Sequence, residues 1–381
     1  MQIKTVKFIL IFLFLFIIDL KYGIEKLHIY KYKHYIRECF NLKRYHRKAI
    51  KIKFPYISIC LPAYNMKKYI EKAIMSILNQ SFQNFEIIIV NDNSKDKTLE
   101  IIKKLQLKDD RIKLINHSNN SGVYTSRVDS IFSSKGKYLL LMDPDDILIN
   151  PNILENIFNY NLDKNLDIIE FTVFSFFEDN NRLVYNERYF HFHKFFKNII
   201  SQPQLDDIQF NSNGIKNDFN VGCRVIWNKI IKKKILIKSI QYIGKDYYKA
   251  FFITAEDTLL NILSFHFAKN YSNIKIPGYM YNIRNRSMTH GKKGKKRKII
   301  FCYNHFLYFK KLYIFIKNFN KSRRILYNEL VELNKRLIKL NKLTKNNTEI
   351  LIFYNNILND KYLFKNFTDV INIFILEINN N

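Results

Sequence analysis

The chain has 381 residues, with 63 Lys or Arg against 33 Asp or Glu, so its formal net charge is +30. Its hydrophobic content of 47% supports a packed core and excludes global disorder. There are only 9 Gly and 6 Pro, with no heptad and no Gly-X-Y period, which excludes coiled coils and collagen. The 4 Cys form no Cys-x-x-Cys pair, which argues against a zinc ribbon or a disulfide scaffold.

The excess positive charge lies mainly in the two flanks of the chain. Residues 1–54 and 291–381 hold most of it, whereas residues 55–290 are closer to neutral. A nucleic-acid-binding protein usually carries its basic patch on the folded domain. We therefore predict no nucleic-acid partner. Basic flanks suit contact with an anionic membrane surface or with other anions.

Residues Phe8–Ile18 form an unbroken apolar run, FILIFLFLFII, behind Lys4 and Lys7. The run is shorter than the roughly 20 residues that span a bilayer, and no small-x-small cleavage site follows it. We predict an uncleaved signal anchor over residues 1–24 and a basic stem over residues 25–54, with a buried core helix as the alternative to the anchor. The protein would then be a single-pass membrane protein. The flanking charges leave the compartment open between Golgi or ER and a bacterial inner membrane.

Strand and helix patterns alternate from residue 55 onward. Strands are predicted at Tyr56–Leu61, Phe85–Val90, Ile112–Ile115, Lys137–Met142 and Asp167–Phe177. Helices are predicted at Lys67–Leu78, Asp96–Leu105 with Ser94 as N-cap, Tyr124–Phe132, and from Pro151. This alternation predicts an α/β fold with a doubly wound, mostly parallel, Rossmann-like sheet in a domain over residues 55–294. Residues Asn180–Asn220 are interpreted as irregular loops, and residues 295–381 as a basic helical extension.

Polar residues follow three of the predicted strands. In a doubly wound sheet, ligands bind beyond the carboxyl ends of the strands. The segments at these ends are Pro62-Ala63-Tyr64-Asn65, Asn91-Asp92-Asn93-Ser94 and Asp143-Pro144-Asp145-Asp146. Each segment alone also fits ordinary turn chemistry. Three of them in one domain indicate a binding site.

The pair Asp143 and Asp145 is the strongest of these signals. Two carboxylates two residues apart, after a buried strand, repel each other unless a cation lies between them. Hard oxygen ligands suit Mg²⁺ or Mn²⁺ held together with substrate phosphates, and such an ion neutralises a leaving diphosphate. The alternative is an acidic helix N-terminus, which explains Asp146 better than Asp143.

Three further segments contain side chains suited to substrate binding or catalysis. The Asp92 carboxylate is suited to accept a hydrogen bond from the N3–H of a uracil or from a ribose hydroxyl. Gly122 opens a helix in which the Arg127 guanidinium is suited to bind diphosphate oxygens. Glu256 and Asp257 begin an apolar helix, so they are either helix-capping acids or, for Asp257, a general base.

The segment Tyr279–Thr289 is interpreted as a cationic loop that closes over phosphates, with Arg284 and Arg286 as its charged residues. Trp227 fits either a core position or an acceptor platform.

These segments occur in a familiar order: ISICLPAYN, ILNQSFQNFEIIIVNDNSKDKT, NNSGVYTSR, KYLLLMDPDD, VIWNKI, AEDTLL and YNIRNRSMT. Together they resemble a family 2 glycosyltransferase of the GT-A fold, over about residues 56–290. The resemblance implies a nucleotide-diphospho-sugar donor, a divalent metal and inverting transfer. It implies donor contacts at Pro62, Ala63, Tyr64, Asn65, Asp92, Gly122 and Arg127, an acid near the nucleotide at Glu71, metal and diphosphate contacts at Asp143 and Asp145, and a catalytic base at Asp257.

The chain departs from the family pattern at three places. Asn93 stands where Gly is common, but Asn also tolerates a left-handed conformation. Val128-Asp129 replaces the Asn that often follows Arg127, and Pro144 is the middle residue of the metal motif. The base motif is intact.

The sequence therefore predicts a membrane-anchored, Mn²⁺- or Mg²⁺-dependent inverting glycosyltransferase that uses a UDP-sugar and a glycan or lipid acceptor. A noncatalytic nucleotide-sugar-binding membrane protein on the same fold is the alternative, and a basic nucleic-acid-binding protein is a more distant one.

Overall fold

The computed structural model describes residues 54–186, 199–202, 225–249, 251–284 and 295–318. The predicted anchor, nearly all of the predicted stem, Arg286 and residues 319–381 lie outside these ranges. Among the helices described, none is long and apolar enough to cross a membrane. The anchor at residues 1–24, the stem and the domain boundaries remain predictions.

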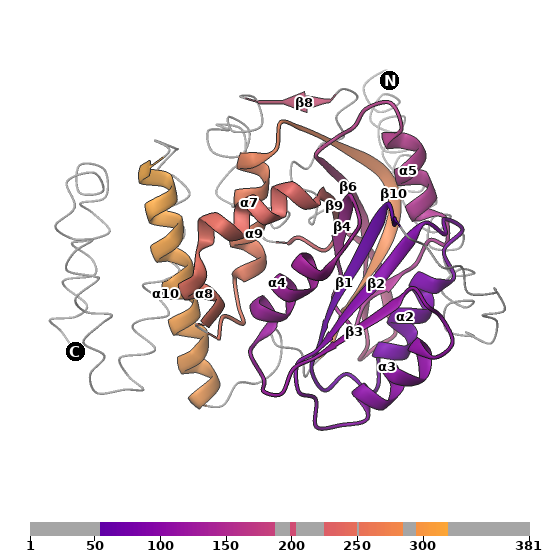
Figure 1. Ribbon diagram of the computed structural model, residues 1–381, viewed down its shortest axis with the longest axis horizontal. Coiled ribbons are helices and arrows are strands. Elements are labelled where there is room, and N and C mark those ends of the chain that lie inside the picture. Colours follow the sequence, from indigo (N-terminus) through magenta and orange to yellow (C-terminus); the bar gives the residue numbers. More distant parts are fainter. Residues whose placement is uncertain (1–53, 187–198, 203–224, 250, 285–294, 319–381) are drawn as a thin grey trace, which may run out of the picture.

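One large mixed sheet forms the centre of the described structure (Figure 1). Its strands follow the order β3-β2-β1-β4-β9-β6-β10-β5, while β7 pairs with β6 and β8 pairs with β10. Six strands, namely β1, β2, β3, β4, β6 and β10, run in the same direction, and β9 is antiparallel to both of its neighbours. The strands are β1 (Ile57–Ala63), β2 (Phe85–Asn91), β3 (Ile112–Asn116), β4 (Tyr138–Leu141), β5 (Ile147–Leu148), β6 (Ile168–Phe177), β7 (Arg182–Asn186), β8 (Ile200–Ser201), β9 (Lys229–Lys232) and β10 (Asn270–Ile283).

Helices cover both faces of the sheet, as Figure 1 shows. One face carries α2 (Ile70–Leu78), α3 (Thr98–Gln106) and α5 (Ile153–Asn161), and the other carries α4 (Val123–Ser133), α7 (Lys233–Ile243) and α9 (Glu256–Phe267). The short α8 (Lys245–Lys249) and the long α10 (Lys295–Asn318) lie outside this second layer.

Each face of the sheet has its own hydrophobic core, because side chains alternate along a strand. In β1, Ile57, Ile59 and Leu61 pack with α2, α3 and α5, whereas Cys60 packs with α4, α7 and α9. Burial on both faces explains why β1 and β2 are almost continuously apolar.

The prediction of an α/β fold with a mostly parallel sheet is confirmed, and each predicted strand exists within two residues of its expected bounds. Three local predictions are wrong. Ser94 does not cap α3; its hydroxyl accepts a hydrogen bond from the Asn65 backbone at 3.0 Å. Residues 279–283 belong to strand β10 rather than to a loop, because they pair with β6 and β5. The stretch interpreted as irregular, Asn180–Asn220, contains β7 and β8.

The parallel strands end at one level, and this alignment creates the edge on which the site is built. Ala63 pairs with Asn91, and Asn91 pairs with Asn116, so β1, β2 and β3 finish in a single row. Cys60 pairs with Leu141, which brings the end of β4 to within a few residues of that row. The residues that follow these strands therefore come together, as expected for a doubly wound sheet.

Gly136 offers a test of the packing between the turn before β4 and strand β1. A Cβ at this position would lie 2.6 Å from the Ser58 backbone nitrogen and 2.9 Å from the Ile57 carbonyl carbon. We expect Gly136→Ala to lower the free energy of unfolding by about 1–3 kcal/mol, because backbone must shift to admit the methyl group. Urea unfolding followed by circular dichroism measures this. Ser133→Ala, at an exposed position nearby, should change stability by less than about 0.5 kcal/mol; equal effects of the two changes would contradict the packing argument.

Candidate active site

The loop after β4 is held in place by Asp146. This side chain is fully buried, and its carboxylate accepts hydrogen bonds from the Tyr279 hydroxyl and the Asn282 backbone N–H, both at 2.7 Å. The Tyr279 oxygen in turn accepts the Asp143 backbone N–H at 3.1 Å. Burial raises the pKa of Asp146 well above its usual range. Asp146 therefore anchors the loop to β10, which is a different role from the helix cap considered above.

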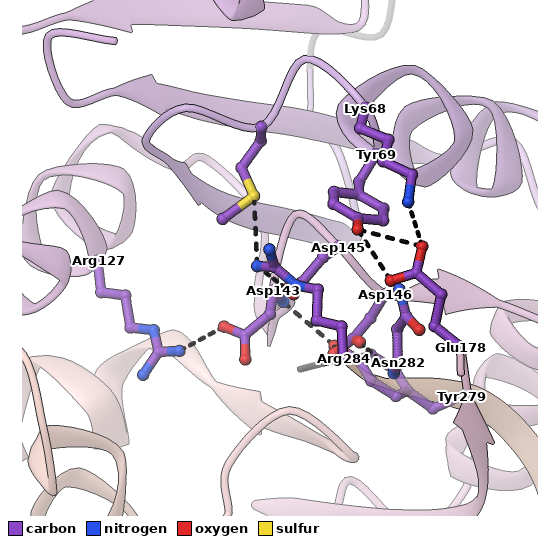
Figure 2. Close-up of polar contacts among 11 residues, drawn as sticks. Lys68, Tyr69, Arg127, Asp143, Asp145, Asp146, Glu178, Tyr279, Asn282 and Arg284 are labelled. Atoms are coloured by element: carbon purple, nitrogen blue, oxygen red, sulfur yellow. Dashed lines mark hydrogen bonds and ion pairs between the residues drawn. The ribbon is translucent and has the colours of Figure 1, made fainter. Parts of the chain in front are cut away.

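Asp143 and Asp145 each contact an arginine from a distant part of the chain (Figure 2). Arg127 Nη2 lies 2.6 Å from Asp143 Oδ1. Arg284 Nε and Nη2 both lie 2.7 Å from Asp145 Oδ2. The Asp143 and Asp145 side chains are 27% and 14% exposed, so both carboxylates remain partly accessible. Burial raises the pKa of Asp145, and the Arg284 guanidinium opposes that shift.

Arg127 connects the β4 loop to the start of α9. Its side chain is 4% exposed, and Nη1 lies 2.7 Å from Glu256 Oε1 while Nη2 holds Asp143. The predicted diphosphate contact thus binds two carboxylates of the protein. Burial raises the pKa of Glu256 to about 8, with the neighbouring Asp257 adding to the shift and Arg127 opposing it.

Asp257, the predicted base, lies at the second position of α9 next to Glu256. It is partly exposed, and its Oδ1 accepts the Thr258 backbone N–H at 2.8 Å. Burial also raises the pKa of Asp257, and Arg127 opposes the shift. The two adjacent acids therefore differ in access to solvent: Glu256 is buried against Arg127, and Asp257 faces partly outward. Ala255, which precedes them, has a left-handed backbone with φ of 62°, a conformation that costs energy for a residue with a side chain.

Asp92 connects the loop after β2 to the loop after β3. Its carboxylate accepts the backbone N–H groups of Ser121 and Gly122, both at 2.8 Å, and contacts His117 Nδ1 at 2.9 Å. Gly122 precedes α4 with φ of 91°, and a Cβ there would lie 3.0 Å from Ile253 Cγ2. Gly122 is therefore required for both its conformation and the close approach of the chain.

The predicted nucleotide contacts at the end of β1 and in α2 differ in solvent exposure. Pro62 and Ala63 are the last, buried residues of the strand, whereas Tyr64 is 43% exposed. Glu71 is exposed in the first turn of α2. Tyr64 is thus the most accessible ring at this strand end.

The loops after β1 and β2 bind each other. Asn65 Oδ1 accepts the Lys95 N–H at 2.8 Å, and the Asn65 N–H donates to Ser94 at 3.0 Å. Asn65 and Asn93 have φ of 55° and 58°. Asn93 thus adopts the left-handed conformation that asparagine tolerates more readily than most residues.

Sequence reasoning missed several residues of this site. His117 Nε2 lies 3.0 Å from Asp129 Oδ2, and the Tyr248 hydroxyl donates to Asp129 Oδ1 at 2.8 Å. The position of His117 directly after β3 was a usable signal, because the same strand-end rule identified Asp92. Tyr69 and Glu178, which contact each other beside Arg284, carry no comparable signal.

Trp227 belongs to the core. Its side chain is 3% exposed and stacks between Tyr279 and Tyr281, with ring centroids 4.8 Å and 5.1 Å away. The platform interpretation therefore does not fit its position.

The chemistry of the loop suits a hard divalent cation. Asp143 and Asp145 supply partly exposed carboxylate oxygens from one turn, which is the usual protein contribution to a Mg²⁺ or Mn²⁺ site completed by substrate phosphates. In the described part of the chain, no group of three or more His, Cys, Asp or Glu residues could hold a metal by itself.

Residues 58–233 match the sequence model of a family described as Glycosyl transferase family 2. They belong to that family. An uncharacterized glycosyltransferase of Haemophilus influenzae is 39% identical over 112 residues, which is 29% of this chain and 44% of that protein. A GalNAc(5)-diNAcBac-PP-undecaprenol beta-1,3-glucosyltransferase of Campylobacter jejuni is 36% identical over 97 residues, or 25% of this chain and 31% of that protein. The matched regions span less than half of the length of these relatives.

The fold is similar to that of TarS residues 1–349 from S. aureus. The TM-score is 0.50 at 19% sequence identity, over 72% of this chain and 70% of that one. This similarity agrees with the mixed α/β fold and the large, mostly parallel sheet described above.

The bridge made by Arg127 predicts strong coupling between two distant positions. Arg127→Gln should lower the free energy of unfolding by about 3–5 kcal/mol, because it leaves the buried Glu256 and the partly exposed Asp143 without their shared counter-charge. Adding Glu256→Gln should recover part of this loss, which a double-mutant cycle in urea detects. Lys104→Gln removes a charge from an exposed site of α3 and serves as the control. Simple additivity of the two substitutions would contradict the bridge.

Proposed function

We propose that this protein is a metal-dependent, inverting glycosyltransferase that transfers a sugar from a UDP-sugar to a hydroxyl of a glycan or lipid acceptor. The observation that carries the proposal is the Arg127 bridge. It joins Asp143, in the candidate cation-binding loop, to Glu256, the neighbour of the candidate base. Membership of residues 58–233 in a glycosyltransferase family supports the reaction class.

The donor side of the proposed site is the row of strand ends. Asp92 and Gly122 would contact the nucleotide, together with the segment from Pro62 to Asn65. Arg127 would contribute through its charge beside the diphosphate, and Glu71 would lie at the outer edge. Asp143 and Asp145 would hold Mn²⁺ or Mg²⁺, which when bound supplies positive charge to the leaving diphosphate.

The acceptor side is the N-terminus of α9. Asp257 would take the proton from the acceptor hydroxyl, and the resulting oxygen nucleophile would attack the anomeric carbon from the face opposite the diphosphate, which inverts its configuration. A pKa raised by burial suits a carboxylate that must accept a proton near neutral pH. Glu256 is a poorer candidate because Arg127 holds it in the interior.

Membrane attachment is part of the proposal. The anchor predicted for residues 1–24 would make this a single-pass membrane protein. A lipid-linked acceptor would then lie in the same membrane as the enzyme. The Campylobacter jejuni relative, whose name contains a PP-undecaprenol-linked glycan, supports this acceptor class. The competing function is a membrane protein that binds nucleotide sugars without turnover.

A donor panel tests the proposed function. The full chain in detergent is offered UDP-, GDP- and dTDP-sugars with Mn²⁺, and with EDTA in a parallel series, while release of the nucleoside diphosphate is measured. Release from a UDP-sugar that requires Mn²⁺ supports the proposal. Tight binding of a UDP-sugar without release, in the presence of glycan and lipid acceptors, favours the binding-only function. Release that is equal in EDTA contradicts metal dependence.

Asp257→Asn separates catalysis from binding. The substitution preserves size but removes the proton acceptor, so turnover should fall by about 10²–10⁴. UDP affinity should change by less than about threefold, because the nucleotide contacts lie on other strand ends. Turnover per folded molecule and UDP binding by calorimetry are measured together. Asp163→Asn, at an exposed position after α5, is the matched control and should keep full turnover. Full activity of folded Asp257→Asn would remove Asp257 from the mechanism.

A further inference from the structure

Arg284 contacts a candidate cation ligand instead of facing solvent. It follows strand β10, and two of its nitrogens lie 2.7 Å from the same oxygen, Asp145 Oδ2. Its side chain is 15% exposed. A guanidinium that donates twice to one oxygen engages the lone pairs of Asp145 Oδ2 that a metal ion bound to this oxygen would need.

Two groups of the loop after β1 hold Arg284 in this position. The guanidinium carbon lies 4.8 Å from the centroid of the Tyr69 ring, a cation–π contact, and Nη2 lies 3.7 Å from Met66 Sδ. Figure 2 shows Tyr69 and Arg284 close to the Asp143–Asp146 loop. The loop that begins with the predicted nucleotide contacts therefore also positions Arg284.

Glu178 fixes the Tyr69 ring in turn. The Tyr69 hydroxyl donates to Glu178 Oε2 at 3.0 Å, and Lys68 pairs with the same carboxylate. The Glu178 backbone N–H donates to the Ile283 carbonyl at 3.0 Å, directly before Arg284. A continuous series of contacts therefore runs from Lys68 through Glu178 and Tyr69 to Arg284 and Asp145, and it involves neither Arg127 nor Asp257.

We propose that Arg284 competes with the divalent cation for Asp145, and that Tyr69 and Glu178 are positioning residues that set the strength of this competition. The proposal rests on the cation site of the proposed function. A cation and a guanidinium repel each other at one carboxylate oxygen, so the cation binds weakly while Arg284 holds Asp145. A donor diphosphate offers Arg284 another anion and releases Asp145. Cation and donor therefore bind cooperatively, and the coupling is reciprocal.

The test measures Mn²⁺ affinity of the full chain by electron paramagnetic resonance, without and with saturating UDP. In the wild type, UDP should tighten Mn²⁺ binding by about 10-fold or more. Arg284→Gln should bind Mn²⁺ about 10-fold more tightly than the wild type without UDP, and UDP should add much less. Tyr69→Phe keeps the ring but loses the Glu178 contact, so it should shift Mn²⁺ affinity in the same direction by a smaller factor, and Glu178→Gln should do the same.

Arg182→Gln is the matched control. Arg182 stacks on Phe177 with its guanidinium carbon 4.6 Å from the ring centroid, one strand away from Glu178, so its loss removes the same charge without touching Asp145. Mn²⁺ affinity equal to or weaker than the wild type in Arg284→Gln without UDP overturns the proposal. So does the absence of Mn²⁺ binding in both proteins. Melting temperatures confirm folding, and the milder Tyr69→Phe variant keeps the test decisive if Arg284→Gln does not fold.

The two proposals can fail separately. Tighter Mn²⁺ binding by Arg284→Gln than by the wild type, with no sugar transfer from any donor, would support the inference and contradict the proposed function. Mn²⁺-dependent sugar transfer with no gain of Mn²⁺ affinity in Arg284→Gln would do the reverse.

Discussion

The arrangement of the site depends on one buried arginine between two carboxylates. Arg127 lies in α4, Asp143 follows β4, and Glu256 begins α9, so three elements far apart in the sequence meet at a single guanidinium. Removing charges from water is costly, and the cost is offset only when each charge is paired at short range. Asp145, Asp146 and Asp257 add further acidic groups to the same region. A nearby positive charge is therefore needed to offset their mutual repulsion. Arg127 therefore bonds the loop after β4 to the start of α9.

The aspartates of the β4 loop differ in function because they differ in surroundings. Asp146 has no exposure and accepts two hydrogen bonds from β10, so it fixes the backbone of the loop. Asp143 and Asp145 are then presented with partial exposure, each beside a guanidinium. Three neighbouring residues of the same type thus differ: Asp146 holds the loop in place, while Asp143 and Asp145 keep partly accessible oxygens. The same division recurs at α9, where Glu256 is held inside and Asp257 faces partly outward.

Positive charge reaches this loop from two directions, and the two arginines differ in how they are held. Arg127 is almost fully buried and bonded at both ends of its guanidinium, which makes it a fixed part of the fold. Arg284 is bonded to one carboxylate and stacked on a ring whose own position depends on an exposed lysine and a partly exposed glutamate. A guanidinium held in this way is easier to displace. Under the proposed competition, the site has one permanently held guanidinium, Arg127, and one, Arg284, that a donor diphosphate would draw away.

The sequence by itself determined the α/β class, the first four parallel strands and the acidic residues at their ends, because period-2 and period-3.6 patterns and strand-end turns are local features. It also allowed a left-handed Asn93 and indicated the helix that begins at Glu256. Only the tertiary structure decided the pairing of Arg127 with Asp143 and Glu256, the burial of Trp227, and the contacts of Tyr69 and Glu178 with Arg284. The short strand β9 and the late strand β10 were missed for the same reason: their neighbours in the sheet are distant in the sequence, and pairing partners leave no local pattern. Burial and long-range partners decide which carboxylate anchors a loop and which keeps accessible oxygens, and neither can be read from the spacing of residues along the chain.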